Sequence, residues 1–204
     1  MYIPDIYKHE NQDEIREFIR NNSFGILVNI TDGKPWATHI PLELEINSEG
    51  KEVLCGHISR ENPQWKSFSA ESQVLAIFSG PNAYISSSWY DHENVPTWNY
   101  IAVHVYGTIK ILEGDAVIEH LKKLVNKYEA VSENPVSVEG FSSKTMLQSR
   151  GIVVFEILIN EIHAKRKLSQ NRDDVNYKNI ITELEKIESP NTAAIAAEMK
   201  KCPR

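Results

Sequence analysis

The chain has 204 residues, of which 41% are hydrophobic and 25% charged, a composition that excludes a disordered or collagen-like protein. Its 28 acidic and 22 basic residues give a formal charge of −6. This charge argues against a protein whose main task is to bind duplex DNA, because the affinity of proteins for DNA comes largely from neutralising its phosphates. No apolar run approaches the roughly 20 residues of a membrane-spanning helix. The N-terminus has neither the basic nor the apolar region of a signal peptide. We therefore expect a cytoplasmic protein without membrane association.

The first part of the chain predicts a helix followed by an antiparallel meander. Asn11 is placed to cap the helix, whose apolar residues recur at helical spacing. The Asp32-Gly33 pair supplies the positive φ angles of a tight hairpin, and residues 47–50 form a second polar turn. The strands predicted here are residues 24–30, 35–44 and 51–58.

The second part alternates strands with helices. Asn62 followed by Pro63 predicts the start of a short helix, since proline tolerates the first helical position. Residues 115–130 are amphipathic and predict a longer helix, and Gly107 marks a bend or bulge in a long strand. The strands predicted here are residues 74–79, 83–87, 98–112 and 151–163, followed by a helical or loose remainder.

These elements predict a mainly β protein with peripheral helices, in which the strands form a closed antiparallel barrel. A doubly wound parallel fold fits worse, because the early turns are too short for parallel crossovers. The chain has no internal repeat, low-complexity stretch or flexible linker. We therefore expect residues 1–204 to form a single domain with a helical C-terminal extension.

The first candidate site lies where a predicted strand ends in His57, Ser59 and Arg60. Asn62 follows as the cap of the short helix. Arginine offers a planar fork of donors and serine a hydroxyl, while the N–H groups at a helix start favour an anion. This combination suits a phosphate monoester. The alternative is an ordinary helix cap beside a solvated arginine.

Two further segments carry candidate binding residues. Trp89 lies beside a polar turn and Trp98 begins a strand, so these rings can wall a flat ligand or form a subunit contact. For Trp98 we favour ordinary barrel packing. Residues 167–172 follow the last predicted strand, and the basic residues from Lys165 onward are expected to be a solvated strand end. The loop could reach a phosphate, a ring carbonyl or another subunit, or be a simple surface loop. Its candidate ligands are Lys167, Ser169, Gln170 and Arg172.

The sequence lacks the common metal-binding, nucleophilic and nucleotide-binding motifs. The seven histidines form no HExxH motif or close Cys/His pairing, so no metal site is expected. No serine lies in a G-x-S-x-G elbow, and Cys55 and Cys202 show no local sign of activation. P-loop and GxGxxG motifs are also absent. No catalytic residue is assigned.

Several segments form a pattern that runs in order over nearly the whole chain. They are Met1-Tyr2-Ile3-Pro4, residues 56–65, Gly80-Pro81, Tyr84-Ile85-Ser86, Trp89-Tyr90, residues 95–100 with His104 and Gly107, and residues 167–172. In these segments the chain resembles the PaiB family, described as FMN-binding negative transcriptional regulators. One departure is Ser87, where relatives are expected to have proline.

The resemblance implies a split β-barrel related to pyridoxamine-phosphate oxidases and flavin reductases, assembled as a homodimer with FMN at the subunit interface. By position, Ser59 and Arg60 resemble the pair that holds the cofactor phosphate, with His57 and Asn62 as neighbours. Trp89, Trp98 and the 167–172 loop resemble elements beside the flavin ring or across the dimer. The implied function is a flavin-dependent sensor that regulates transcription. A flavin-dependent oxidoreductase is the alternative, and direct DNA binding ranks last.

Overall fold

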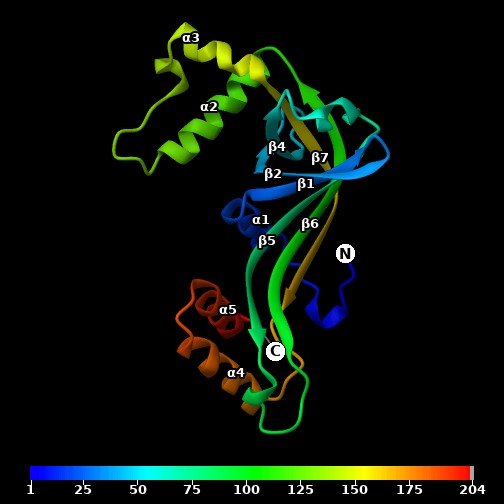
Figure 1. Ribbon diagram of the computed structural model, residues 1–204, viewed down its shortest axis with the longest axis vertical. Coiled ribbons are helices and arrows are strands. Elements are labelled where there is room, and N and C mark those ends of the chain that lie inside the picture. Colours follow the sequence, from blue (N-terminus) through cyan, green and yellow to red (C-terminus); the bar gives the residue numbers. More distant parts are fainter. Residues whose placement is uncertain (203–204) are drawn as a thin grey trace. The chain divides into compact units, whose positions relative to one another are not determined.

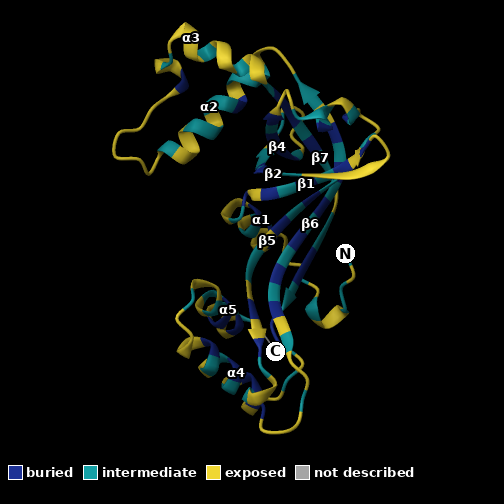
Figure 2. Cartoon of the chain, in the orientation of Figure 1, coloured by how far each residue is buried: buried dark blue, intermediate teal, exposed yellow. Residues whose placement is uncertain are grey.

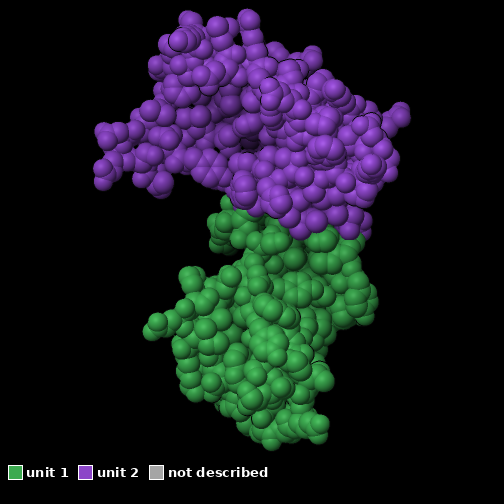
Figure 3. Space-filling model, in the orientation of Figure 1, with its two compact units in different colours: residues 1–22, 78–104, 162–204 green, residues 23–77, 105–161 purple. Residues whose placement is uncertain are grey.

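The computed structural model describes residues 1–202. Among them, no helix is long and apolar enough to span a membrane. The chain forms two compact units (Figure 3). Unit 1 contains residues 1–22, 78–104 and 162 onward, and unit 2 contains residues 23–77 and 105–161. Three long strands contribute residues to both units, and the expected single domain stays a prediction.

The strands form one seven-stranded sheet in the order β2-β1-β5-β6-β7-β4-β3 (Figure 1). Strand β1 pairs antiparallel with β2 and β5, and β4 pairs antiparallel with β3 and β7. The strands are β1 (Phe24–Thr31), β2 (Lys34–Pro41), β3 (Glu43–Ile46), β4 (Glu52–Ser59), β5 (Gln73–Ile85), β6 (Thr97–Leu112) and β7 (Ile152–Lys167).

Unit 2 is closed into a barrel by the chain itself. Strands β2 and β3 stand at opposite ends of the sheet order, and only the fully buried Leu42 separates them in the sequence. The N–H of Leu42 donates to the carbonyl of Ser23 (2.8 Å). A Cβ at Gly56 would lie 3.0 Å from both the Leu42 side chain and the Pro41 carbonyl, so glycine lets the junction lie against β4. The single strand predicted over residues 35–44 is therefore wrong: the chain changes its pairing partner at Leu42.

Two strands are longer than predicted. Residues 74–79 and 83–87 were expected as separate strands, but β5 is continuous from Gln73 to Ile85. Pro81 lies beyond the pairing of β5 with β1, which covers Leu75–Ile77, so its missing N–H breaks no bond between these two strands. Strand β7 continues to Lys167 instead of ending near residue 163.

Gly107 lies in β6 at a close approach to β7. A Cβ at this position would come within 2.3 Å of the Leu158 carbonyl oxygen. The glycine noted in the sequence thus permits close contact between two backbones.

The helical core of unit 1 covers one face of the strands there. Helix α1 (Gln12–Asn21) begins as predicted: the Asn11 side chain accepts from the N–H groups of residues 13 and 14, and Ile15 and Ile19 are buried. Helices α4 (Asp174–Lys186) and α5 (Pro190–Lys201) pack on the sheet through one apolar cluster. Its members include Ala83, Ile85, Ile101, Leu168, Tyr177, Ile180, Leu184, Ile195, Ala196 and Met199.

The remaining helices are short or lightly packed, as the burial colours in Figure 2 show. In α2 (Asp115–Glu129), which confirms the predicted long helix, His120 is the buried residue. The short helix expected at Asn62-Pro63 is a 3-10 helix. The others are α3 (Ser143–Met146), η1 (Asp5–Tyr7), η2 (Pro63–Ser67), η3 (Ser87–Trp89), η4 (Val138–Gly140) and η5 (Leu147–Gly151).

Candidate flavin site

Arg60 is exposed just beyond the end of β4, in unit 2, and its side chain is held by main-chain carbonyls. Its Nε donates to the carbonyl of Arg150 (2.8 Å) and its Nη2 to the carbonyl of Ile152 (2.9 Å). Its guanidinium also lies 5.8 Å from the centre of the Trp65 ring. These contacts fix the direction of the fork and leave Nη1 as the nitrogen for an external acceptor.

Ser59 is the exposed hydroxyl beside this arginine. Its Oγ accepts from the N–H of Glu61 (3.2 Å), so the hydroxyl hydrogen can still donate to another group. The main-chain N–H of Arg60 is held by the carbonyl of Gly151 (2.8 Å). An exposed hydroxyl donor next to an oriented guanidinium fits a phosphate monoester, so the residues present fit the anionic end of FMN.

Asn62 has both polar side-chain atoms committed within the chain. Its Oδ1 accepts from the N–H of Gln64 (3.1 Å) and its Nδ2 donates to the Thr38 hydroxyl (2.9 Å). Gln64 is completely buried and donates to the side chain of Asn29 (2.9 Å) and the carbonyl of Leu27 (3.3 Å). This series of hydrogen bonds fixes the start of η2. Gln64 is not among the residues predicted from the sequence, where its only signal is an amide directly after a helix-starting proline.

His57 faces helix α2. Its Nδ1 lies 3.0 Å from Nε2 of His120, and the two rings meet edge-on with centres 5.2 Å apart. Burial lowers the pKa of His57. Burial, helped by the charge of His57, lowers the pKa of His120 to about 4. The pair is thus a neutral contact between β4 and α2. No local pattern indicates it, because the two residues are 63 positions apart.

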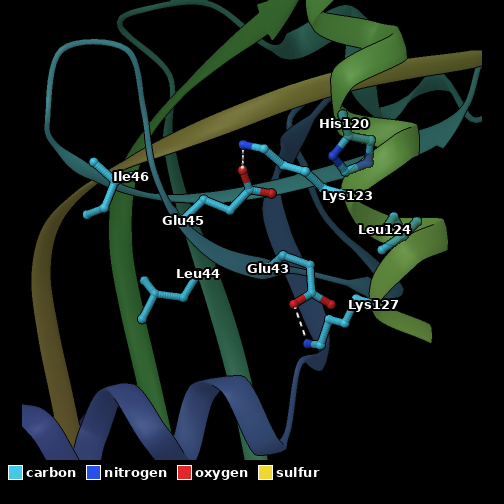
Figure 4. Close-up of a pocket in the computed structure, with 8 residues that line it drawn as sticks. All are labelled: Glu43, Leu44, Glu45, Ile46, His120, Lys123, Leu124 and Lys127. Carbon is cyan, nitrogen blue, oxygen red and sulfur yellow. Dashed lines mark hydrogen bonds and ion pairs between the residues drawn. The ribbon is translucent and has the colours of Figure 1, made fainter. Parts of the chain in front are cut away.

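A cavity of about 310 Å³ lies beside this histidine pair, between β3 and α2 (Figure 4). Two ion pairs cross it, Lys123 with Glu45 and Lys127 with Glu43, each at 2.5 Å. The Tyr128 hydroxyl also donates to Glu43 (2.8 Å). The helix is therefore held here by polar contacts.

The second group of candidate residues lies in unit 1, around the end of β7. Lys167 donates to the Thr97 hydroxyl, and burial lowers its pKa, with smaller effects from the positive charges of Lys165 and Arg172. Lys165 is only 8% exposed, so the expectation of a solvated strand end is wrong for this residue. Its Nζ lies 5.2 Å from the centre of the Tyr100 ring. Strand β7 continues through Lys165 and buries its stem, which the local charge pattern could not show.

The cations of this cluster are set among aromatic rings. The Arg172 guanidinium lies 5.0 Å from the centre of the Tyr90 ring, and Lys165 also lies 5.9 Å from that of Tyr2. Within the part of the chain that the structure describes, neither Lys165 nor Lys167 has a carboxylate partner. Two lysines without a carboxylate partner favour an anionic ligand.

Ser169 and Gln170 shape the loop rather than point outward. Ser169 has a positive φ of 61°, and its buried hydroxyl donates to Asn99 (3.0 Å). Gln170 donates to the carbonyl of Arg166 (2.5 Å) and accepts from the N–H of Leu168 (2.8 Å). These bonds hold the turn that presents Lys167 and the following residues.

The two tryptophans differ in exposure. Trp98 is 53% exposed and meets Tyr84, itself 47% exposed, edge-on at 5.9 Å. The expectation that Trp98 packs inside the barrel is therefore wrong, and its ring is open to a ligand or another subunit. Trp89 is half-buried in η3, against the apolar cluster under α4 and α5.

The candidate residues thus form two groups, one in each unit. Unit 2 holds His57, Ser59, Arg60 and Asn62, and unit 1 holds Trp89, Trp98, Lys167, Ser169, Gln170 and Arg172. Among the described residues, no group of three or more His, Cys, Asp or Glu side chains is arranged to hold a metal ion.

Comparison with known proteins identifies the family. The model of the family described as "Putative FMN-binding domain" matches residues 1–161. The chain is 46% identical over 202 residues to "Protease synthase and sporulation protein PAI 2" of Bacillus subtilis (strain 168), covering 98% of this chain and 97% of that protein. The chain belongs to the PaiB family of FMN-binding proteins. The predicted family and the predicted cofactor, FMN, are confirmed.

Solved structures confirm the fold of this PaiB-family protein. The FAD and heme binding protein of Mycobacterium smegmatis superposes with a TM-score of 0.63 at 13% identity, covering 84% of this chain and 78% of that chain. The flavocytochrome Anf3 of Azotobacter vinelandii superposes with a TM-score of 0.59 at 17% identity, covering 84% and 75%. With the seven-stranded sheet, these matches confirm the predicted antiparallel split β-barrel with peripheral helices.

Proposed function

We propose that Ser59 and Arg60 bind the phosphate of FMN and that the protein acts as a flavin-dependent sensor in negative transcriptional regulation. The observation that carries the proposal is the fixed fork of Arg60, held by two main-chain carbonyls beside the open Ser59 hydroxyl. Because the side chain is already ordered, binding a phosphate costs little further conformational entropy. His57 and Asn62 stabilise the end of β4, where Ser59 and Arg60 lie, through their contacts with other residues of the chain.

We further propose that the cation and aromatic group of unit 1 also takes part in flavin binding and faces the partner subunit of a homodimer. Lys167 and Arg172 offer positive charge, and the exposed ring of Trp98 offers a flat apolar surface. Ser169, Gln170 and Trp89 hold these groups in place. Exposed aromatic surface of this kind is typical of ligand and subunit contacts.

When bound, the isoalloxazine ring supplies the redox chemistry, and the residues of the chain supply binding and electrostatics. Ser59 and Arg60 anchor the phosphate, while the positive charge of unit 1 favours electron-rich forms of a ring placed near it. A flavin-dependent oxidoreductase is a second candidate, supported by the lowered pKa of Lys167, which makes that ammonium a better proton donor. Bleaching of bound FMN by NAD(P)H would favour this candidate.

The regulatory role is proposed without direct DNA binding. The net charge of −6 opposes a large phosphate-binding surface. A gel shift that persists at about 0.15 M salt would restore direct binding, because weak electrostatic contacts fade there. We propose a cytoplasmic location, which is compatible with the two free cysteines, Cys55 and Cys202.

The test is a titration with FMN and with riboflavin, which lacks the phosphate. Arg60→Ala should raise the Kd for FMN about tenfold to a hundredfold, the effect of one charge-assisted contact, and leave riboflavin nearly unchanged. Arg150→Ala is the matched control, because only the main-chain carbonyl of Arg150 takes part and its side chain is also exposed. Equal losses for both ligands would place the phosphate elsewhere. Light scattering on the same samples tests the dimer.

A further inference from the structure

Trp65 contacts Arg60 in two ways. Its indole Nε1 donates to the main-chain carbonyl of Arg60 (2.9 Å), and the centre of its ring lies 5.8 Å from the Arg60 guanidinium. The first contact is a hydrogen bond to the main chain, and the second lies within the range of a cation–π interaction. Trp65 therefore contacts both the backbone and the charged end of the residue that we assign to the phosphate of FMN.

The hydrogen bond from Trp65 also fixes the peptide unit between Arg60 and Glu61. The carbonyl of this unit accepts from the indole, and its N–H, which belongs to Glu61, donates to Oγ of Ser59 (3.2 Å). Because a peptide unit is planar, holding its carbonyl also sets the direction of its N–H. The indole thus acts on Ser59 as well: it orients the N–H that occupies the Ser59 oxygen, and the hydroxyl hydrogen stays available to a phosphate.

Further hydrogen bonds join Arg60 to residues 150–152. The carbonyl of Gly151 accepts from the main-chain N–H of Arg60 (2.8 Å), and the carbonyls of Arg150 and Ile152 accept from its side chain. These bonds hold the N–H and the guanidinium of Arg60, whereas the bond from Trp65 holds its carbonyl. Loss of the indole donor would therefore loosen the link between Arg60 and η2 while the other bonds remain.

Trp65 is itself held in place by buried residues of unit 2. It lies in η2 directly after Gln64, which is completely buried and bonded to Asn29 and Leu27 of β1. The carbonyl of Trp65 accepts from the N–H of Phe68 (3.0 Å), and its side chain is half-buried. The position of the indole is therefore set by the core of the barrel before any ligand binds.

We propose that Trp65 is a positioning residue of the phosphate site and that it increases the preference of this protein for FMN over riboflavin, an inference that rests on the assignment of the FMN phosphate to Ser59 and Arg60. Trp65 acts without touching the ligand: it holds Ser59 and Arg60 in the geometry that receives a phosphate. Such preorganisation raises affinity by reducing the entropy lost on binding. It favours only the flavin that carries the phosphate.

The test is Trp65→Phe, which keeps an aromatic ring but removes the Nε1–H donor, titrated with FMN and with riboflavin. The Kd for FMN should rise about threefold to tenfold, the effect of losing one hydrogen bond, and the Kd for riboflavin should stay nearly unchanged. Trp36→Phe is the matched control, because Trp36 is a partly exposed tryptophan on β2 of the same unit, and it should change neither Kd. A role in stability alone would not change the ratio of the two Kd values, so an unchanged ratio in Trp65→Phe would overturn the proposal.

Two further variants separate positioning from a local change of fold. 3-Benzothienylalanine at position 65 replaces the indole N–H with sulfur at nearly the same shape, so it should give the same selective loss of FMN affinity; wild-type affinity would refute the role of the hydrogen bond. In the Ser59→Ala/Arg60→Ala background, Trp65→Phe should leave the Kd for FMN unchanged, because the groups that it positions are gone. The same rise in Kd as in the wild-type background would show that Trp65 acts elsewhere.

The titrations distinguish failure of this inference from failure of the phosphate site. Equal losses of FMN and riboflavin in Arg60→Ala would remove the phosphate site and the positioning role of Trp65 with it. A loss of FMN alone in Arg60→Ala, with both ligands unaffected by Trp65→Phe, would leave the phosphate site in place and refute only the role of Trp65.

Discussion

The buried pair of His57 and His120 predicts that mild acid destabilises this protein. The pKa of His120 is lowered from the ordinary 6.5 to about 4, chiefly by burial. Above pH 6.5 both the folded and the unfolded states keep this ring neutral, and the full stability is present. As the pH falls from 6.5 toward 4, this ring binds a proton in the unfolded state but not in the folded state. The free energy of unfolding therefore decreases across this pH range.

The size of the loss follows from the pKa difference. The interval between 6.5 and about 4 corresponds to about 3 kcal/mol, at about 1.4 kcal/mol per pH unit. The side chain of His120 is almost fully buried, so solvent screening reduces this figure little. Burial also lowers the pKa of His57, which adds to the loss in the same direction.

Urea unfolding followed by circular dichroism between pH 7 and pH 4 measures this effect. Other groups titrate in the same range, so the informative quantity is the difference between the wild type and His120→Gln, which keeps a polar group without an imidazole. The free energy of unfolding of the wild type, minus that of His120→Gln, should fall by about 3 kcal/mol as the pH is lowered. His39→Gln, at an exposed position on β2, should follow the wild type. Parallel curves for wild type and His120→Gln would refute the reasoning.

Two other predictions concern close packing and burial. Gly107→Ala should lower the free energy of unfolding by about 3 kcal/mol, because its Cβ would collide with the Leu158 carbonyl. Gly140→Ala should change it little, because the atom nearest to a Cβ there is 3.8 Å away. Equal urea midpoints for the two variants would contradict the argument. Burial raises the pKa of the Cys55 thiol to about 12, so in the native protein it should react with iodoacetamide far more slowly than after unfolding, as mass spectrometry can follow; equal rates would contradict its burial.

Local sequence patterns determined most of the elements of this protein. The cap at Asn11, the Asp32-Gly33 turn and the helical spacing over residues 115–130 all correspond to observed elements. Each of these signals lies within a few residues of the structure that it predicts, because capping, turn geometry and amphipathic spacing are short-range effects. The ordered family motifs added the split barrel and FMN.

Tertiary structure alone decided the partners of the site residues. Arg60 is held by carbonyls about 90 positions away, and His57 meets a histidine 63 positions away. The break at Leu42 and the burial of Lys165 also depend on which strands lie alongside these residues. Such contacts join distant segments whose approach is set by sheet order and chain closure, and no local periodicity records that approach.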